Sequence, residues 1–461
     1  MNRRRFLATA PALATLPLRA AGNGTNVLFL VADDLNTELG CYGHPVARTP
    51  NLDRLAGRGT RFDRAYCQFP LCAPSRASFL SGRRPETTRV WTLTTPTRQH
   101  MPDVVMLPQL FRSNGWFSAQ LGKIYHTGEE HHDPRSWDFN LEESGKNPPE
   151  SEVLESHRMP GPRNHTMEWA RLKTPDDRTP DGIVARKGVD LIRRCTKEGR
   201  PFFLGVGFRR PHSPYAAPSR YFDLYDPNGI PLPEGPAGHE RSLLPAARYE
   251  LETQPRPTDK QTRFYRAAYY ACNSFLDAQV GLLLNAVEEL DLWRNTAIVF
   301  LGDNGYHTGQ HGMWHKMTLF EESARVPLIL YAPGARSQGQ VCRGLVELVD
   351  LYPTLAAIAG LRPPEGLEGS SLLPWLQDPS RPGKPAVFTM VGRHPDRSLM
   401  NREVTYLGKS VRTERWRYTE WDGGRQGVEL YDEAKDPAEW NNLAADPSLR
   451  PVLAQLRSQL R

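Results

Sequence analysis

The feature that most constrains the fold is a series of apolar runs that each end in polar or charged residues. The first of them reads NVLFLVADDLN. Unbroken apolar runs of this length are typical of strands buried on both faces, as in parallel sheets. The runs occupy residues 26–36, 115–126, 201–215, 294–316 and 326–334.

Helical patterns fall between these runs, for example at 181–194 and 265–290. Strands that alternate with helices predict an α/β fold with a large mixed, mainly parallel sheet flanked by helices. We expect residues 24–374 to form the domain that contains this sheet. The segments 128–180 and 225–262 are rich in proline, histidine and charge, and we interpret them as long surface loops.

The residue pattern of the sequence changes towards the carboxyl end. Stretches such as KSVRTERWRYTEW alternate aromatic and charged residues, as hairpin strands do. A closing helix is expected at about 451–461. Residues 375–461 are therefore predicted to form a smaller C-terminal α+β subdomain with an antiparallel sheet.

Residues 1–20 have the composition of an export signal. Arginines 3–5 precede an apolar stretch, and Ala20 and Ala21 offer small residues for cleavage. The order Arg-Arg-Arg-Phe-Leu fits the twin-arginine type, so the export machinery is an expected partner and the periplasm or the exterior an expected location. A membrane anchor is the alternative, but the stretch is short and broken by Pro11 and Pro17.

Charge and cysteine content argue against a nucleic-acid-binding protein and against a disulfide-rich scaffold. The formal net charge is +6, and four arginines without any acid lie in residues 1–20, so the remaining chain is nearly balanced. Such a balance does not favour general binding of nucleic acid. Six cysteines in 461 residues are too few for a disulfide scaffold, although one or two bridges stay open.

Acidic and amide side chains follow two of the apolar runs. Asp33 and Asp34 end the first, and Asp303 and Asn304 end the fourth. Carboxylate and amide oxygens suit a hard cation such as Ca²⁺. A turn or helix cap at Asp33 and Asp34 is the alternative. The second pair, after an equally apolar run, favours the metal site.

Basic side chains follow the same predicted strands. Lys123 and His126 come after the second run, His212 after the third, and Lys316 a short loop after the fourth. Cations there would hold an anionic group, and a histidine could move a proton. Either histidine could instead be a loop residue with a backbone partner, so the hypothesis rests on their shared position.

One further stretch, PLCAPSRASFLSG, places Cys72 before Pro74 and Arg76, with no neighbouring histidine to activate a thiol. It resembles the signature of the sulfatase family. GWFSAQLGKIYH resembles that family's second signature, DDLN and GDNG its metal motifs, and ELYDEAKDPAEWNNLA its C-terminal subdomain. The resemblance covers nearly the whole mature chain, with Ser81 and Trp116 as small departures. The alternative is a buried structural cysteine, or one paired with Cys67.

The resemblance implies a chemistry for each of these residues. Cys72 would be oxidised to formylglycine by a separate generating enzyme, and Arg76 would be a fixed cation beside it. One Ca²⁺ per chain would be held by the four strand-end residues and by residue 72. Lys123 and Lys316 would offset the charge of the sulfuryl oxygens. The expected proton carriers are His212 for the departing alcohol, with Lys316 as its rival, and His126 for the release of sulfate.

The substrate is less constrained. The stretches GKIYHTG, RRPHSPY and GQHGMWHK resemble the branch that contains iduronate-2-sulfatases. This implies a sulfated carbohydrate, such as a 2-O-sulfated uronic acid within a glycan. A phosphonate monoester or phosphodiester hydrolase with the same nucleophile, and a non-catalytic binder of sulfated glycans, are the alternatives.

Overall fold

A computed structural model describes residues 24–142, 149–161, 166–248, 256–394 and 404–460. The predicted signal at 1–20 lies outside the described residues. Within them, no helix has both the length and the apolar character that crossing a bilayer requires.

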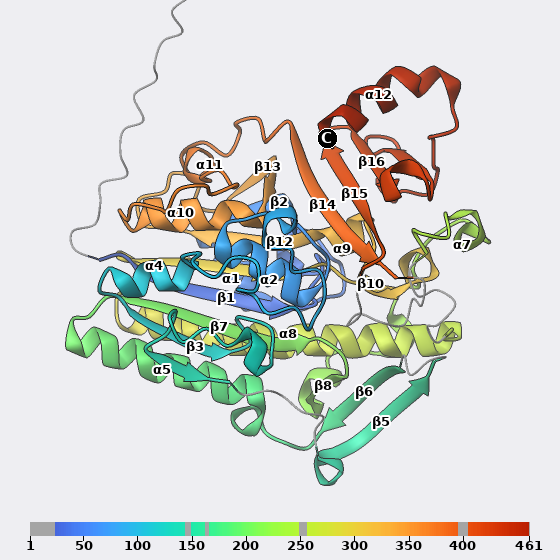
Figure 1. Ribbon diagram of the computed structural model, residues 1–461. Coiled ribbons are helices and arrows are strands. Elements are labelled where there is room, and N and C mark those ends of the chain that lie inside the picture. The colour runs from blue at the N-terminus through green and yellow to red at the C-terminus, as the bar shows by residue number, and fades with distance from the viewer. Residues whose placement is uncertain (1–23, 143–148, 162–165, 249–255, 395–403, 461) are drawn as a thin grey trace, which may run out of the picture.

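An eight-stranded sheet forms the centre of the molecule (Figure 1). Its order is β13-β2-β12-β9-β1-β7-β3-β4, and every neighbouring pair is parallel except the two that involve β12. The predicted large, mainly parallel mixed sheet is confirmed. Its strands are β1 (Asn26–Asp33), β2 (Thr60–Tyr66), β3 (Phe117–Gly122), β4 (Phe139–Leu141), β7 (Phe202–Pro211), β9 (Thr296–Gly302), β12 (Arg325–Tyr331) and β13 (Gln340–Glu347).

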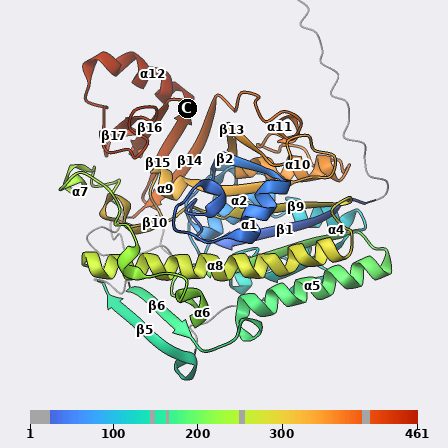
Figure 2. The same cartoon turned by 180° about the vertical axis from the view of Figure 1, so that it is seen from behind.

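Helices cover both faces of this sheet. One face packs against α2 (Cys72–Ser81), α4 (Leu107–Ser113), α10 (Leu351–Ile358) and α11 (Leu373–Gln377). The other packs against α1 (Pro50–Arg58), α5 (Pro180–Glu198) and α8 (Asp259–Glu289), and the last two run side by side in Figure 2. Because both faces are covered, all eight residues of β1 are buried, as its apolar sequence predicts.

Local sequence signals fix the ends of the long helices. The Thr179 side chain caps the start of α5, Pro180 occupies its first position, and Gly199 ends it with a positive φ of 63°. Thr258 and Gln261 form a reciprocal capping box at the start of α8.

A four-stranded and a three-stranded sheet flank the main one, and β10 (His307–Thr308) pairs with β11 (Trp314–His315) in a two-stranded sheet. The antiparallel sheet of the C-terminal region is followed by α12 (Arg450–Gln459), so the expected hairpins and closing helix are confirmed. The predicted domain boundary after residue 374 stays a prediction. The C-terminal strands are β14 (Ala386–Arg393), β15 (Tyr406–Thr413), β16 (Trp416–Trp421) and β17 (Val428–Asp432), and the three-stranded sheet comprises β5 (Val153–Pro160), β6 (Thr166–Leu172) and β8 (Tyr215–Pro218).

The prediction that 128–180 is loop throughout is wrong. This segment contains β4, β5 and β6. Strand β5 is exposed along most of its length, so its sequence VLESHRMP is too polar to show the apolar pattern of a buried strand. The short elements of the chain are α3 (Pro85–Thr88), α6 (Ser219–Phe222), α7 (His239–Ser242), β10 (His307–Thr308), β11 (Trp314–His315) and α9 (Glu321–Ala324).

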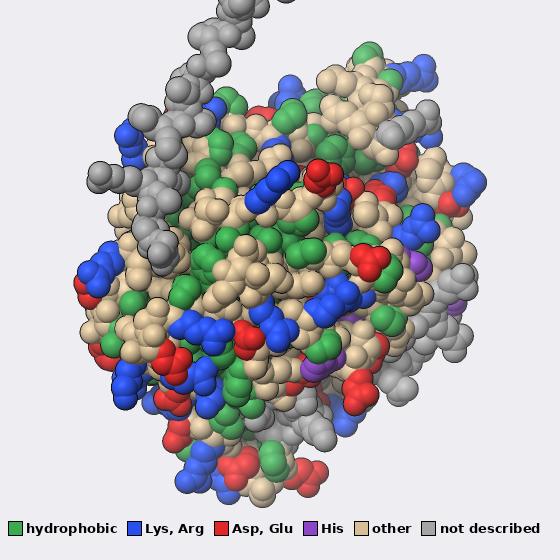
Figure 3. All heavy atoms as spheres, turned by 60° about the vertical axis from the view of Figure 1, so that its left-hand side comes forward, with side chains coloured by type: hydrophobic (Ala, Val, Ile, Leu, Met, Phe, Trp, Pro, Cys, Tyr) green, Lys and Arg blue, Asp and Glu red, His purple; other side chains and the backbone are tan. Residues whose placement is uncertain are grey.

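Basic and acidic side chains are interspersed on the face of the molecule drawn in Figure 3. No single-sign field dominates that face, in keeping with the nearly balanced charge of the chain beyond residue 20.

Candidate active site

The neighbouring parallel strands β1 and β9 bring together the three acids and the one amide at their ends. Ala32 of β1 pairs with Gly302 of β9, so the residues that follow each of them meet at the carboxyl ends of these strands. The backbone N–H of Asp34 donates to Oδ1 of Asp303 (3.0 Å), and Nδ2 of Asn304 donates to Oδ1 of Asp34 (2.9 Å). Asp34 has a positive φ of 63°, which aspartate adopts more readily than most residues.

This group has the chemistry of a site for a divalent cation. Carboxylate oxygens of Asp33, Asp34 and Asp303 all lie within 4.8 Å of one another, and all three residues are buried. The amide oxygen of Asn304 is also buried and lacks a hydrogen-bond partner. Burial raises the pKa of Asp34, and that of Asp303 to about 6, because neither charge is compensated fully by its neighbours. Three crowded carboxylates and an unsatisfied amide oxygen fit a hard metal ion.

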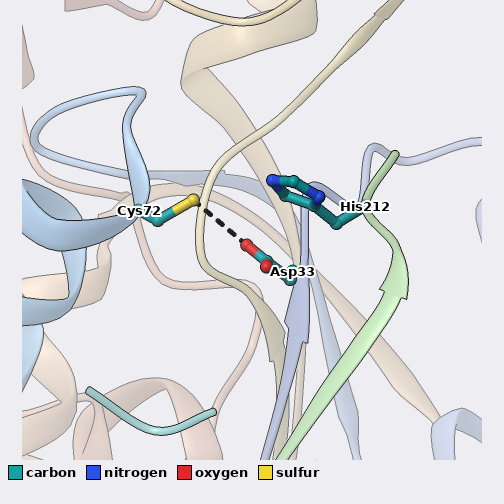
Figure 4. Close-up of side chains that lie close together, drawn as sticks. All are labelled: Asp33, Cys72 and His212. Carbon is teal, nitrogen blue, oxygen red and sulfur yellow. Dashed lines mark hydrogen bonds between the residues drawn. The ribbon is translucent and has the colours of Figure 1, made fainter. Parts of the chain in front are cut away.

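Cys72 points into this cluster from the first turn of α2. Its Sγ lies 3.1 Å from Oδ1 of Asp33 (Figure 4). The same Sγ lies 3.0 Å from Nζ of Lys316. Burial and then the charge of Asp33 raise the pKa of the thiol. An unmodified Cys72 would therefore be a poor thiolate nucleophile.

The six cysteines, all within the described residues, are free. The structure therefore does not support the alternative pairing of Cys72 with Cys67. None of the one or two bridges left open by the sequence is formed.

Three cations lie against the carboxylates. Arg76, one turn after Cys72, donates Nε to Oδ2 of Asp303 (2.8 Å), and Lys123 donates Nζ to Oδ2 of Asp33 (2.5 Å). Lys316 forms an ion pair with Asp34. Burial alone would raise the pKa of Asp33, but Lys123 and its other basic neighbours hold it well below its usual range. The same reasoning applies in reverse to Lys316: burial lowers its pKa, and the carboxylates outweigh burial and raise it.

The two histidines occupy different surroundings. His212 lies on the β7 side of Asp33, and Nε2 of His212 is 3.7 Å from Oδ2 of Asp34 (Figure 4). His126 lines a small hollow with Lys123 and packs edge-on against His131 at 5.1 Å between ring centroids. Its Nδ1 is buried and has no hydrogen-bond partner. Burial, aided by the charge of Lys123, lowers the pKa of His126 to about 2, so the ring is neutral.

The predicted residues thus lie close together at the carboxyl ends of the strands. Close polar contacts join nine of them to one another, and His126 shares its hollow with Lys123. These contacts place the side chains, while their roles in a reaction stay predictions. The nine are Asp33, Asp34, Cys72, Arg76, Lys123, His212, Asp303, Asn304 and Lys316.

Sequence reasoning gave no role to several residues that support this site. The hydroxyl of Ser75 donates to the backbone carbonyl of Asp303, and Ser75 lies within the cysteine motif itself. Asp181 accepts hydrogen bonds from the chain just before His212, although its sequence position indicates only a helix start. No pattern in the sequence could have linked Asp181 to the site.

Comparison with known proteins decides the family. The sulfatase family model matches residues 25–361. The chain belongs to the sulfatase family. A second model, described as N-sulphoglucosamine sulphohydrolase, C-terminal, matches residues 309–461. This sulfatase is therefore a sulfuric ester hydrolase.

Individual relatives agree with this assignment. The sulfatase is 32% identical to human iduronate 2-sulfatase, and the match covers 91% of each chain. A solved 2-O GAG sulfatase is 26% identical with a TM-score of 0.74, covering 95% of this chain and 91% of that one. The phosphonate monoester hydrolase of Agrobacterium radiobacter, at 24% identity, shares the fold with a TM-score of 0.77 over 95% of this chain and 96% of that one.

Proposed function

We propose that this sulfatase hydrolyses a sulfate monoester on a sulfated carbohydrate, such as a 2-O-sulfated uronic acid or a related glycan, after Cys72 has been converted to formylglycine. The observation that carries the proposal is the position of Cys72. Its side chain reaches the carboxylate cluster and Lys316 together, within 3.1 Å of each. A buried thiol of raised pKa would be a poor nucleophile there, whereas an oxidised and hydrated side chain would offer a hydroxyl group as the nucleophile.

Formylglycine, as its hydrate, supplies an oxygen nucleophile together with a second hydroxyl group. Asp33, Asp34, Asp303 and Asn304 would hold one Ca²⁺, with residue 72 completing the set. The ion supplies positive charge that favours an ionised oxygen. Arg76 holds Asp303 in place through the Nε contact of 2.8 Å and so keeps one of these ligands oriented.

The remaining basic residues act on the substrate. Lys123 and Lys316 stabilise the negative charge that develops on the sulfuryl oxygens. Burial lowers the pKa of His212 well below its usual range, so the ring needs the anionic ester beside it to raise that pKa before it donates a proton to the departing alcohol. His126, whose buried Nδ1 has no hydrogen-bond partner, accepts the proton that is freed when sulfate leaves, provided that the anion beside it offsets the burial that lowers the pKa of the ring. Lys316, whose pKa is raised, is the rival proton donor.

The relatives support the substrate class. Human iduronate 2-sulfatase and the 2-O GAG sulfatase both bear names that refer to 2-sulfated sugars. The phosphonate monoester hydrolase of similar fold keeps a second candidate open, namely a phosphonate ester as substrate.

A substrate panel tests the proposal. Purified, matured enzyme should release sulfate from an aryl sulfate faster than it cleaves the matching aryl phosphate and phosphonate ester. It should also favour a 2-O-sulfated uronic acid disaccharide over a 6-O-sulfated glucosamine and over choline sulfate. A dominant phosphonate rate would replace the proposed reaction, and a preference for another sulfated compound would replace the proposed substrate.

We also propose that the protein acts in the periplasm or outside the cell, exported by the twin-arginine route after Cys72 has matured in the cytoplasm. The support is the sequence of residues 1–20 alone. Replacement of Arg3 and Arg4 by lysine should leave the protein in the cytosolic fraction. Unchanged export of that variant would refute the route.

A further inference from the structure

The strand that leads to His212 is irregular where it passes the site. Ala32 of β1 pairs with Phe208 of β7, but the next residue of β1, Asp33, pairs with Pro211. Two extra residues, Arg209 and Arg210, are therefore bulged out of β7. A bulge turns the side chains that follow it, and it leaves its own backbone groups without partners in the sheet.

A single carboxylate receives both of the N–H groups in this bulge. The backbone N–H of Arg209 donates to Oδ1 of Asp181 (2.8 Å), and that of Arg210 donates to Oδ2 (3.0 Å). Asp181 lies in the first turn of α5, where the helix dipole favours a negative charge, and it is only 5% exposed. Because the two oxygens are both used, Asp181 fixes the bulge to the start of α5.

The side chain of Arg210 holds the other end of the same turn. Its Nη1 donates to the backbone carbonyls of His212 (2.8 Å) and Pro214 (2.6 Å), and the residue is 7% exposed. Among the described residues, no carboxylate lies within 4.0 Å of this guanidinium. A buried cation that bonds only to loop carbonyls is costly, so its contribution must come from holding the loop.

These bonds determine how His212 faces the site. The N–H of His212 closes the turn on the carbonyl of Arg209 (2.9 Å), and Nδ1 of the ring lies 2.6 Å from the carbonyl of Ser213. A carbonyl can only accept, so Nδ1 carries the hydrogen and Nε2 is the atom that faces Asp34.

We propose that Arg210 and Asp181 are positioning residues that hold His212 at the distance and angle needed to protonate the departing alcohol. The inference rests on the role of His212 in the proposed function. Proton transfer requires hydrogen-bond reach, and a displacement of about 1 Å is enough to cost roughly 100-fold in rate. Neither residue needs to touch the substrate.

Leaving-group dependence gives a test that a purely structural role would not satisfy. An aryl sulfate with an acidic phenol, such as para-nitrophenyl sulfate, needs little protonation of its leaving oxygen, whereas an alkyl sulfate needs much. We expect Arg210→Ala to lower kcat/KM for the alkyl ester about 10- to 100-fold and for the nitrophenyl ester less than about 3-fold. Arg210→Lys, which keeps a cation but loses the planar guanidinium that directs Nη1 to both carbonyls, should fall between Arg210→Ala and the parent enzyme.

A double-mutant cycle separates positioning from general damage. His212→Ala should show the same selective loss, and adding Arg210→Ala to it should cost little more, because the two residues act as one unit. Asp181→Asn removes one of the two acceptors and should show a weaker loss of the same kind.

Arg112 provides a control for the loss of an arginine that holds a loop elsewhere. Its Nη1 also donates to two backbone carbonyls, those of Pro134 (2.7 Å) and Arg135 (3.1 Å). Unlike Arg210, it is partly exposed and pairs with Asp138 (2.9 Å), and it lies in α4, before the start of β3 and so at the opposite end of the strands from the site. Arg112→Ala should change both esters equally or not at all.

The outcomes distinguish the two proposals. Equal losses for both esters in Arg210→Ala, with a selective loss in His212→Ala, would overturn the positioning role alone. A non-selective loss in His212→Ala, with a selective loss in Lys316→Ala, would overturn the proton-donor role of His212 and with it the inference. If Arg210→Ala does not fold, Arg210→Lys still decides, since a loss that is independent of the leaving group would contradict positioning.

Discussion

Asp33, Asp34 and Asp303 are buried carboxylates, and their charges have to be balanced from nearby. Lys123, Lys316 and Arg76 supply positive charge at contact distance, yet burial still raises the pKa of Asp34 and Asp303. The crowding of three carboxylates, together with the unpartnered amide oxygen of Asn304, is the physical basis of the proposed metal site.

Asp303→Asn tests this balance at a single residue. The substitution keeps the shape of the side chain but removes one negative charge from the ligand set. We expect loss of the bound divalent ion and a fall in kcat of more than about 100-fold. Metal analysis of the purified variant, together with turnover of an aryl sulfate, measures both.

Asp63→Asn is the control for that experiment. Asp63 lies in the middle of β2 and pairs with Arg61 at 3.1 Å, outside the site. It should keep full metal content and activity. An Asp303→Asn protein with unchanged metal content and unchanged turnover would contradict the assignment of Asp303.

At the level of elements, the site depends on the close approach of β3 and β7. A side chain on Gly207 would place Cβ 2.0 Å from the backbone oxygen of Lys123, and one on Gly122 would meet the oxygen of Gly207 at 2.2 Å. Only glycine allows the chain to turn so tightly after β3, and this turn directs Lys123 towards Asp33.

Gly207→Ala should therefore damage both stability and catalysis. We expect a loss of about 1–3 kcal/mol in the free energy of unfolding, because backbone atoms have to move, and a lower kcat/KM from the displacement of Lys123. Urea unfolding and aryl sulfate turnover measure the two effects.

Gly57, in α1, provides the comparison, because a Cβ on this residue would have no other atom within 4 Å. Gly57→Ala should leave turnover unchanged and add up to about 1 kcal/mol of stability from helix propensity. Equal behaviour of the two alanine variants would refute the steric account of Gly207.

How far the sequence predicts each element depends on burial. Strands β1, β7, β9 and β12 each contain an unbroken apolar run because helices cover both faces, and these runs were predicted. Strands β2 and β13 lie at or next to the sheet edge and mix charges with apolar residues, so their sequences TRFDRAY and QVCRGLVE gave no clear signal.

The site follows the same logic. Its acidic, amide and basic residues were predicted because they follow apolar strands whose carboxyl ends lie side by side, whereas Cys72 and Arg76, both in α2, were predicted from the resemblance of their motif to the sulfatase signature. The sequence assigned no role to Asp181 and Arg210, because their positions matter only through the β-bulge at Arg209 and Arg210. That bulge is a two-residue shift in register between β1 and β7, which exists only in the folded sheet.

In the whole molecule, a buried ionic network joins the C-terminal sheet to the main sheet. Arg417 of β16 is 1% exposed and pairs with Glu439, Glu433 and Glu321. Glu321 begins α9, which leads directly into β12 of the main sheet. The network therefore holds the C-terminal strands against the domain that carries the site.

Arg417→Met tests this connection. Removing the cation takes the partner of Glu439 away and leaves Glu321 and Glu433 paired with Arg412, and we expect a loss of about 3–5 kcal/mol in the free energy of unfolding. Arg425→Met removes an exposed cation that pairs with Asp422 on the surface, where solvent screens the pair, so it should cost far less than Arg417→Met. Denaturant unfolding of both variants compares them, and equal small losses would show that the network does not stabilise the assembly of the two parts.

The central claim, that residue 72 acts as formylglycine rather than as a thiol, has a direct measurement. Trypsin should release residues 65–76, AYCQFPLCAPSR, which contain both Cys67 and Cys72. In active enzyme, mass spectrometry after alkylation should find Cys67 alkylated and residue 72 with CHO in place of CH₂SH. Fully active protein whose peptide carries two alkylated cysteines would contradict the account.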